Sequence, residues 1–223
     1  MTPAEKLQEV YENSERVKEL NSELESILYG TDTGGKSFYD KFWDTYQNYG
    51  NRNYYYYAFT YGYWNDETFN PKYPIICSSS ASANMMLSGV TITDTKVPIE
   101  IITAGNSTFK DCKTLKTIRK LIVYETTTFD NNIFYGCSSL ENIIIEGVIG
   151  NDLRISYSPL NRESIESVIN ALSPTATGKT LTLKKAAVNN AFKVDVDDPT
   201  TYPEDSDWYK LRNSKSNWTI SFA

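Results

Sequence analysis

The 223-residue chain contains no histidine. This absence excludes Ser-His-Asp and Cys-His nucleophilic sites, HExxH metal sites and histidine proton shuttles, because each of them needs an imidazole. Cysteine is scarce: Cys77, Cys112 and Cys137 do not make a disulfide framework, and no two of them form a Cys-x-x-Cys pair. No nucleophile or general base stands out among the other residues, so we predict a protein that is not an enzyme and has no cofactor or metal.

Long apolar runs and basic patches are also missing. No apolar run approaches the ~20 residues that a membrane-spanning helix needs. The net charge of −6, with both signs interspersed, argues against nucleic acid as the main partner. The N-terminus lacks the basic segment and apolar stretch of a secretory signal. We therefore expect a virion component or a protein of the bacterial cytoplasm, with the cell surface as the alternative location.

What the chain does have is a pattern that occurs twice in succession. The first copy contains Phe109, Cys112, Leu115 and Ile118, and the second contains Phe134, Cys137, Leu140 and Ile143. A fixed period of about 25 residues predicts an α/β solenoid, in which each unit buries its apolar side against the next copy. We place the repeats in residues 84–158, and we expect both repeat cysteines to be buried free thiols.

The second copy, FYGCSSLENI, resembles the unit of the BspA-type leucine-rich repeat proteins. That family occurs on bacterial surfaces and in phage or prophage genes of gut Firmicutes. The resemblance extends over roughly residues 84–183, and the string SPLNRESIESVINAL is similar to the end region of phage-encoded members. It implies a short leucine-rich-repeat solenoid that presents a recognition surface, encoded by a phage or prophage.

Each repeat is expected to contain one strand of a parallel sheet, because β-branched residues follow the Leu-x-x-Ile step. Leu115 to Ile118 runs into an apolar stretch at 121–123, and Ile143–Ile145 is the matching run. A weaker strand is expected from Val97 to Ile102. One copy earlier, the same offset places Leu87 in the cysteine column and Val90 in the leucine column.

The N-terminal residues 1–29 are predicted to form one long helix. Val10, Val17 and Leu24 recur at intervals of seven, as do Leu20 and Ile27. This seam is about three heptads long, at the lower limit for a coiled coil. Residues 2–28 are therefore expected either to join copies of the chain into a homo-oligomer or to pack on their own chain.

Residues 30–83 are rich in aromatic side chains and are predicted to cap the solenoid, since a terminal repeat would otherwise expose its apolar face. The same residues open an alternative, because exposed aromatic rings can stack on sugars. The candidate ligand-binding residues are Tyr54, Tyr55, Tyr56, Tyr57, Tyr61, Tyr63 and Trp64.

Gly30 to Ser37 matches a phosphate-binding loop by letter. A nucleotide site of this kind needs a buried strand before the loop. Here a charged helix is expected before it instead. The apolar stretch that ends at Glu125 could imitate the strand and acid that accompany such a loop, but it lies inside the repeat. We therefore interpret Gly30 to Ser37 as a turn between two helices.

Residues 159–223 are predicted to form two helix–strand units that close the sheet. The first has a helix capped by Asn161 that extends to about Leu172, followed by a strand at 180–183. The second has a helix near 207–212 and a strand at 218–222. The acidic residues at 195–207 lack the spacing of a calcium loop, and we interpret them as a solvated loop.

These features predict a non-enzymatic recognition or structural protein. We expect a phage-derived virion or tail-associated protein that binds a protein or a cell-surface glycan through the parallel sheet, with avidity from self-association. A carbohydrate-binding module that uses the tyrosines, and a bacterial cell-surface adhesin, are the alternatives.

Overall fold

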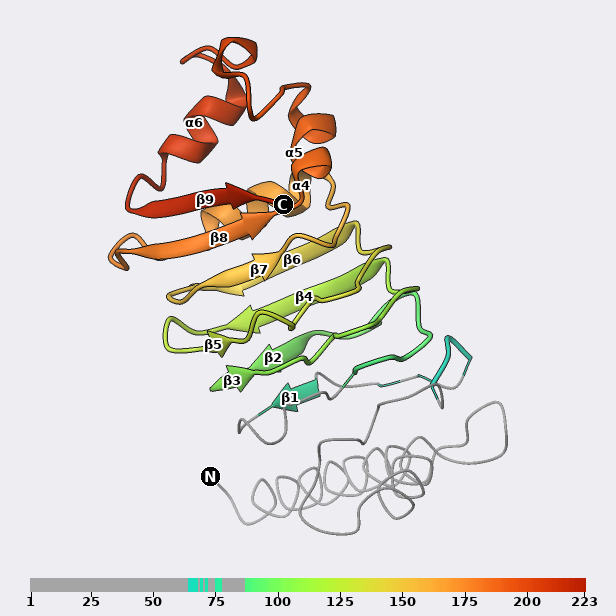
Figure 1. Cartoon of the computed structure of the whole chain (residues 1–223). Helices are drawn as coiled ribbons and strands as arrows, with labels where there is room; N and C mark the ends of the chain where they lie inside the picture. Colours follow the sequence, from blue (N-terminus) through green and yellow to red (C-terminus); the bar gives the residue numbers. More distant parts are fainter. Residues whose placement is uncertain (1–63, 68, 70, 72–74, 78–86) are drawn as a thin grey trace, which may run out of the picture.

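The computed structural model describes residues 64–67, 69, 71, 75–77 and 87–223. The predicted N-terminal helix (1–29) and most of the predicted capping module (30–83) lie outside the described residues. Within them the chain is mixed α/β, and every strand pair is parallel. In Figure 1 the strands lie one above another like successive rungs, from β1 to β9. No helix in the described part of the chain combines the length and apolar character of a membrane span.

The strands pair in the order in which they occur along the chain. One sheet has the order β1-β2-β4-β6 and consists of β1 (Ile75–Cys77), β2 (Ile99–Ile101), β4 (Thr117–Val123) and β6 (Asn142–Gly147). A second, short sheet pairs β3 (Ala104–Gly105) with β5 (Thr128–Phe129). A third has the order β7-β8-β9 and consists of β7 (Leu153–Ile155), β8 (Lys179–Leu183) and β9 (Trp218–Phe222). Because neighbouring strands are parallel, the chain returns to the same end between them, and each return forms one coil of the stack.

The strands predicted from the repeat are present. Ile118 of β4 pairs with Ile143 of β6, so the strands align the two copies of the repeat up to their last shared position, and the register shifts by one residue beyond it. β2 lies within the predicted range of Val97 to Ile102. The predicted parallel sheet is therefore confirmed for these three elements.

The apolar residues of the repeat form the core between successive coils. The rings of Phe109 and Phe134 stack with their planes 1° apart and their centroids separated by 5.4 Å. All eight repeat positions are at most 1% exposed: Phe109, Cys112, Leu115, Ile118, Phe134, Cys137, Leu140 and Ile143. Burying a large apolar side chain stabilises a fold by about 1.5–3 kcal/mol, so this ladder holds the coils together.

Both repeat cysteines are buried free thiols, as predicted. The Cys112 thiol donates to the carbonyl oxygen of Leu87, and the Cys137 thiol donates to that of Phe109, with S···O distances of 2.8 and 2.9 Å. Burial raises the pKa of Cys112 to about 12, and it also raises the pKa of Cys137. A thiol that stays protonated at neutral pH is a poor nucleophile, so these cysteines serve packing.

The coil before the first full copy is shorter than predicted. A constant offset places Leu87 and Val90 in the cysteine and leucine columns, and this prediction is wrong. The Leu87 N–H donates to the carbonyl of Thr108 (2.8 Å), just as the Phe109 N–H donates to that of Ile133 (3.0 Å). Leu87 therefore lies in the phenylalanine column, as the counterpart of Phe109, and Val90 lies in the cysteine column.

A turn with positive φ fixes this register. Gly89, Asp111 and Gly136 occupy the same place in three successive coils, with φ of 70°, 60° and 75°. The Gly89 N–H donates to Lys110, and the Asp111 N–H donates to Tyr135, through their carbonyl oxygens (2.8 and 2.7 Å). Glycine adopts positive φ at no steric cost and aspartate tolerates it better than most residues, so the turn geometry persists while the intervening chain changes length.

The helix predicted after the repeats is present as α4 (Arg162–Asn170). Asn161 caps it, because its side-chain oxygen accepts the Ser164 N–H at 2.9 Å. Ile165, Val168 and Ile169 form its buried face. The predicted cap and apolar stripe are thus confirmed, and the helix ends just before the predicted Leu172.

Helix α4 lies where the next strand beside β6 would be. The N–H of Ile143 donates to the Ser164 hydroxyl, and the N–H of Ile145 donates to the Ser167 hydroxyl, both at 2.8 Å. Two serine hydroxyls thereby replace the carbonyl oxygens of a neighbouring strand. This arrangement satisfies backbone donors that would be costly to leave unpaired in a buried position.

The C-terminal elements close the stack. β8 and β9 confirm the two predicted strands, and Leu181 of the first pairs with Ile220 of the second. α6 (Asp207–Asn213) confirms the second predicted helix. The sequence pattern predicts neither α5 (Lys185–Phe192), which directly follows β8, nor the short 3-10 helix η2 (Pro199–Thr201).

Candidate binding surface

The outer face of the sheet β2-β4-β6 is formed by side chains that alternate with the core residues. On β4, Ile118, Leu121 and Val123 point inward and are at most 1% exposed. Leu121 and Val123 share a face because successive strand residues face opposite sides, and a register shift between Ile118 and Leu121 brings Ile118 to the same face and leaves both Arg119 and Lys120 outside. We call the outward set the sheet face. It consists of Asp94, Glu100, Arg119, Lys120, Ile122, Tyr124, Ile144, Glu146 and Val148.

Charged and hydroxyl side chains of the sheet face are paired from coil to coil. Arg119 forms an ion pair with Asp94 at 2.7 Å, and Lys120 forms one with Glu146 at 2.5 Å. The Tyr124 hydroxyl donates to Glu100 at 2.5 Å, and this hydrogen bond raises the pKa of Tyr124. Exposed pairs of this kind contribute little to stability, but they hold the side chains in defined positions.

Three large apolar side chains stand among these pairs. Tyr124 is 44% exposed, and Ile144 and Val148 are each 36% exposed. Ile144 belongs to β6, Val148 follows it, and Tyr124 follows β4. An aromatic and two aliphatic side chains surrounded by paired charges have the composition of the centre and rim of a protein-binding surface.

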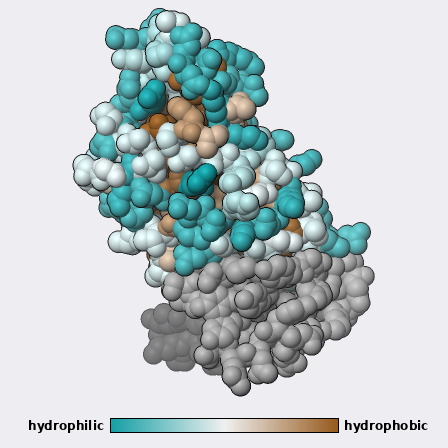
Figure 2. Space-filling view, in the orientation of Figure 1, coloured by the Kyte–Doolittle hydropathy of each residue, from teal (hydrophilic) through white to brown (hydrophobic). Residues whose placement is uncertain are grey.

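In the space-filling view of Figure 2, the described part of the molecule presents mostly hydrophilic and neutral residues on the face shown. Apolar side chains appear there only in small groups between polar ones. A large apolar patch would indicate an interface by its area alone. On a surface that mixes polar and apolar residues, a binding site is instead indicated by where each exposed apolar side chain lies and by which residues surround it.

Glu125 follows the apolar strand β4, where a nucleotide site would have its acidic residue. Its carboxylate instead accepts hydrogen bonds from the hydroxyls of Ser173 (2.5 Å) and Thr175 (3.0 Å). These bonds lower the pKa of Glu125. The residue connects the repeat coils to the C-terminal unit, and the Gly30 to Ser37 loop lies outside the described residues.

Of the seven candidate ligand-binding residues, only Trp64 is described. Tyr54, Tyr55, Tyr56, Tyr57, Tyr61 and Tyr63 lie outside the described residues. Trp64 is fully buried and meets Phe69 edge to face, with ring centroids 6.1 Å apart and planes at 88°. Its ring has no exposed face to stack on a sugar, so Trp64 is a core residue in this structure.

The acidic residues at 195–207 make local turns. Asp195 accepts the N–H of Asp197 (3.1 Å), and Asp198 accepts the N–H of Thr200 (3.0 Å). Among the residues that the structure describes, no group of three or more cysteine, aspartate or glutamate side chains could hold a metal ion.

Tyr124, Ile144 and Val148 are not among the binding residues predicted from the sequence. Tyr124 follows the buried Val123 and Ile144 follows the buried Ile143, so alternation along the two strands would have placed both on the outer face. Val148 lies beyond the end of β6, where alternation gives no such signal.

A scan against protein-family models and searches of curated proteins and of solved structures found nothing that matches this chain.

Proposed function

We propose that the chain is a non-enzymatic recognition protein whose sheet face binds another protein. The observation that carries this proposal is the set of Tyr124, Ile144 and Val148, each about a third or more exposed, among charge pairs that run across neighbouring coils. Binding energy in protein interfaces is concentrated in a few side chains, among which tyrosine is enriched, while the surrounding contacts exclude water.

The fold we propose for this role is a short leucine-rich-repeat solenoid of the BspA type. Three observations support it: parallel strands that pair in chain order, two coils that align the two copies of the repeat, and repeat positions that stack on their own counterparts, as Phe109 does on Phe134. Stacked coils create an extended and regular surface, which suits binding better than it suits enclosing a substrate.

The resemblance of the repeat to phage-encoded members suggests the setting. We propose a virion or tail-associated protein, in which residues 2–28 join copies of the chain and so present several sheet faces together. Multivalent presentation raises the apparent affinity for a partner that is itself repeated, such as a cell-surface protein.

The self-association is tested by light scattering on a sizing column. The wild-type chain should have the mass of an oligomer, and replacing both Leu20 and Leu24 by alanine should give a monomer, because these residues belong to the heptad seam. A monomeric wild-type chain would refute the self-association.

The sheet face is tested by retention of a partner. Immobilised wild-type protein should retain a partner from a host cell-envelope extract, and Ile144→Glu should reduce that retention about tenfold or more. Tyr209→Ala, on helix α6, is the matched control. Equal retention by all three proteins would refute the role of the sheet face.

A further inference from the structure

Exposed side chains form a second surface along the turns that follow β3, β5 and β7. Tyr135 is 41% exposed and Tyr157 is 37% exposed, and their ring centroids lie 4.7 Å apart with the planes tilted by 56°. The Lys110 ammonium lies 5.9 Å from the centroid of Tyr135. Both rings therefore keep part of their surface exposed to solvent.

The same edge leads into a groove one coil further on. The groove has a volume of about 360 Å³ and lies between the loop that begins at Pro159 and helix α5. Apolar and small side chains make most of its wall: Pro159, Leu160, Ala186, Ala187 and Ala191. Tyr157 precedes Pro159 of the groove wall by two positions in the chain. We call the aromatic pair and the groove together the turn edge.

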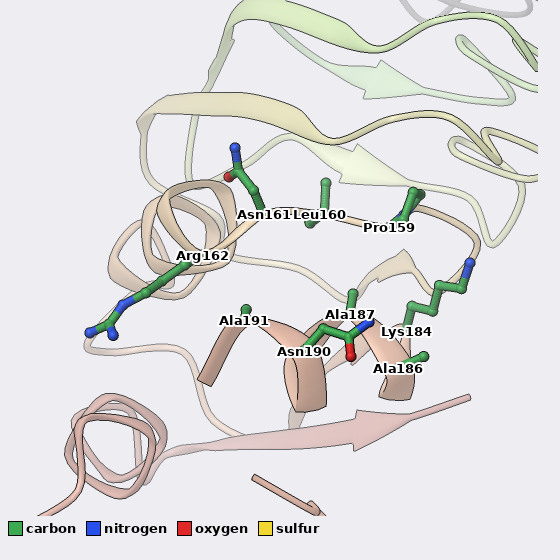
Figure 3. A pocket seen from close by; sticks show the side chains of 9 residues that line it. All are labelled: Pro159, Leu160, Asn161, Arg162, Lys184, Ala186, Ala187, Asn190 and Ala191. Atoms are coloured by element: carbon green, nitrogen blue, oxygen red, sulfur yellow. The ribbon is translucent and has the colours of Figure 1, made fainter. Parts of the chain in front are cut away.

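Polar groups at this groove come from Lys184 and Asn190. In Figure 3 the Lys184 side chain extends toward Pro159, and the Asn190 side chain lies along α5 toward Lys184. Asn161 and Arg162 point away from α5 in the same view. Within the described part of the chain, neither the Lys184 ammonium nor the Asn190 amide has a hydrogen-bond or ion-pair partner.

Two cationic side chains line the groove. Its lining residues include Lys184 and Arg162 and no carboxylate. Arg162 is already paired with Glu166 and Asp207, at 2.7 and 2.6 Å. Of the two cations that line the groove, Lys184 is therefore the one that remains available to a ligand.

We propose that the turn edge binds an acidic saccharide. The exposed parts of the Tyr135 and Tyr157 rings would stack on the C–H face of a sugar ring, as apolar and aromatic walls do in ligand sites. The Lys184 ammonium would bind the sugar carboxylate through a charge-assisted hydrogen bond, and the Asn190 amide would bind a hydroxyl group. A volume of about 360 Å³ lies at the small end of ligand sites.

The geometry favours a sugar over an acidic peptide. An extended peptide gains most of its affinity from backbone hydrogen bonds to an open strand edge, but this groove is bounded by a helix and a loop. Exposed aromatic rings together with an unpaired lysine suit a rigid ring that carries one carboxylate.

The test compares cellobiouronic acid with cellobiose, which differ in the carboxylate alone, by isothermal titration to the full chain. The acidic disaccharide should bind about tenfold more tightly, the value of one charge-assisted hydrogen bond. Lys184→Met should abolish this preference and leave weak binding of both sugars. Tyr157→Ala should weaken both, while Lys210→Met and Tyr209→Ala, both on α6, should change neither.

Each outcome decides the question. Equal binding of the two disaccharides, or a preference that survives Lys184→Met, would overturn the assignment of an acidic ligand. No detectable binding of either sugar by a folded wild-type chain would overturn the site. The sheet face is tested separately, because Tyr124→Ala should leave sugar binding unchanged whether or not that face binds a protein.

Discussion

Replacing Ser164 by alanine tests the junction between the repeat coils and the C-terminal unit. The Ser164 hydroxyl accepts the Ile143 N–H at 2.8 Å. Ser164 is 1% exposed and Ile143 is 0% exposed, so water cannot replace the hydroxyl after the substitution. The change removes one oxygen atom, keeps the helix and leaves one buried donor without a partner.

The magnitude follows from two opposing effects. A buried N–H without an acceptor costs about 1–3 kcal/mol. Alanine is a better helix former than serine, which offsets about 0.5 kcal/mol of that cost. We expect the free energy of unfolding to fall by about 1–2 kcal/mol. Ser167→Ala is the matched control, because its partner Ile145 is only half-buried, and its effect should be at most about 0.5 kcal/mol.

Urea denaturation measures the free energy of unfolding, and amide hydrogen exchange reports on Ile143 directly. The Ser164→Ala protein should lose stability and its Ile143 amide should exchange faster than in the wild type. If Ser164→Ala is as stable as the wild type and the Ile143 amide keeps its full protection, then helix α4 does not serve as the terminal neighbour of β6, and the reasoning is refuted.

Further predictions concern the core and two kinds of titrating group. Leu140→Ala should lower the free energy of unfolding by about 2–5 kcal/mol, since Leu140 is fully buried between coils; a loss below about 0.5 kcal/mol in urea denaturation would contradict the repeat register. Cys112 and Cys137 should resist a thiol reagent at pH 8 in the native protein and react only after unfolding, as mass spectrometry can measure, because burial raises the pKa of both. The pKa of Glu125, lowered chiefly by the Ser173 hydroxyl, should rise toward its ordinary value in Ser173→Ala when titrated by NMR. Since the folded-state pKa is the lower one, the stabilising contribution of Glu125 is present above its unfolded-state pKa and is lost as the pH falls through the lowered value.

The parts of the fold that repeat were the parts that the sequence could predict. Phe109 and Phe134 indicate the coil offset because each packs on its own counterpart. Asn161 indicates the start of α4 through a local side-chain bond that depends on no other part of the chain. The repeat period and the helix cap can both be recognised from the sequence alone, and the structure confirms the elements that they predict.

The remaining features depend on spatial neighbours. The 25-residue period could not reveal that the coil of Leu87 is shorter than the next one. What the two coils share is a turn with positive φ, which is adopted by Gly89 in the first coil and by Asp111 in the second. These two residues have no letter in common, so the sequence pattern does not show the match. Helix α5 has only two buried residues, Ala187 and Val188, which is too weak a stripe to recognise. Trp64 belongs to a tyrosine-rich segment and was a candidate for exposure, yet it is buried and packs on Phe69.

The serine contacts between α4 and β6 have a consequence for how such a chain can lengthen. Once the Ile143 and Ile145 N–H groups bind Ser164 and Ser167, they are not available to another strand. A duplicated repeat unit would therefore have to be inserted before β6. An insertion there would add one rung and leave both ends of the stack unchanged. Duplication of an internal repeat could then lengthen the stack of strands by one coil at a time, while the contact between α4 and β6 stays the same.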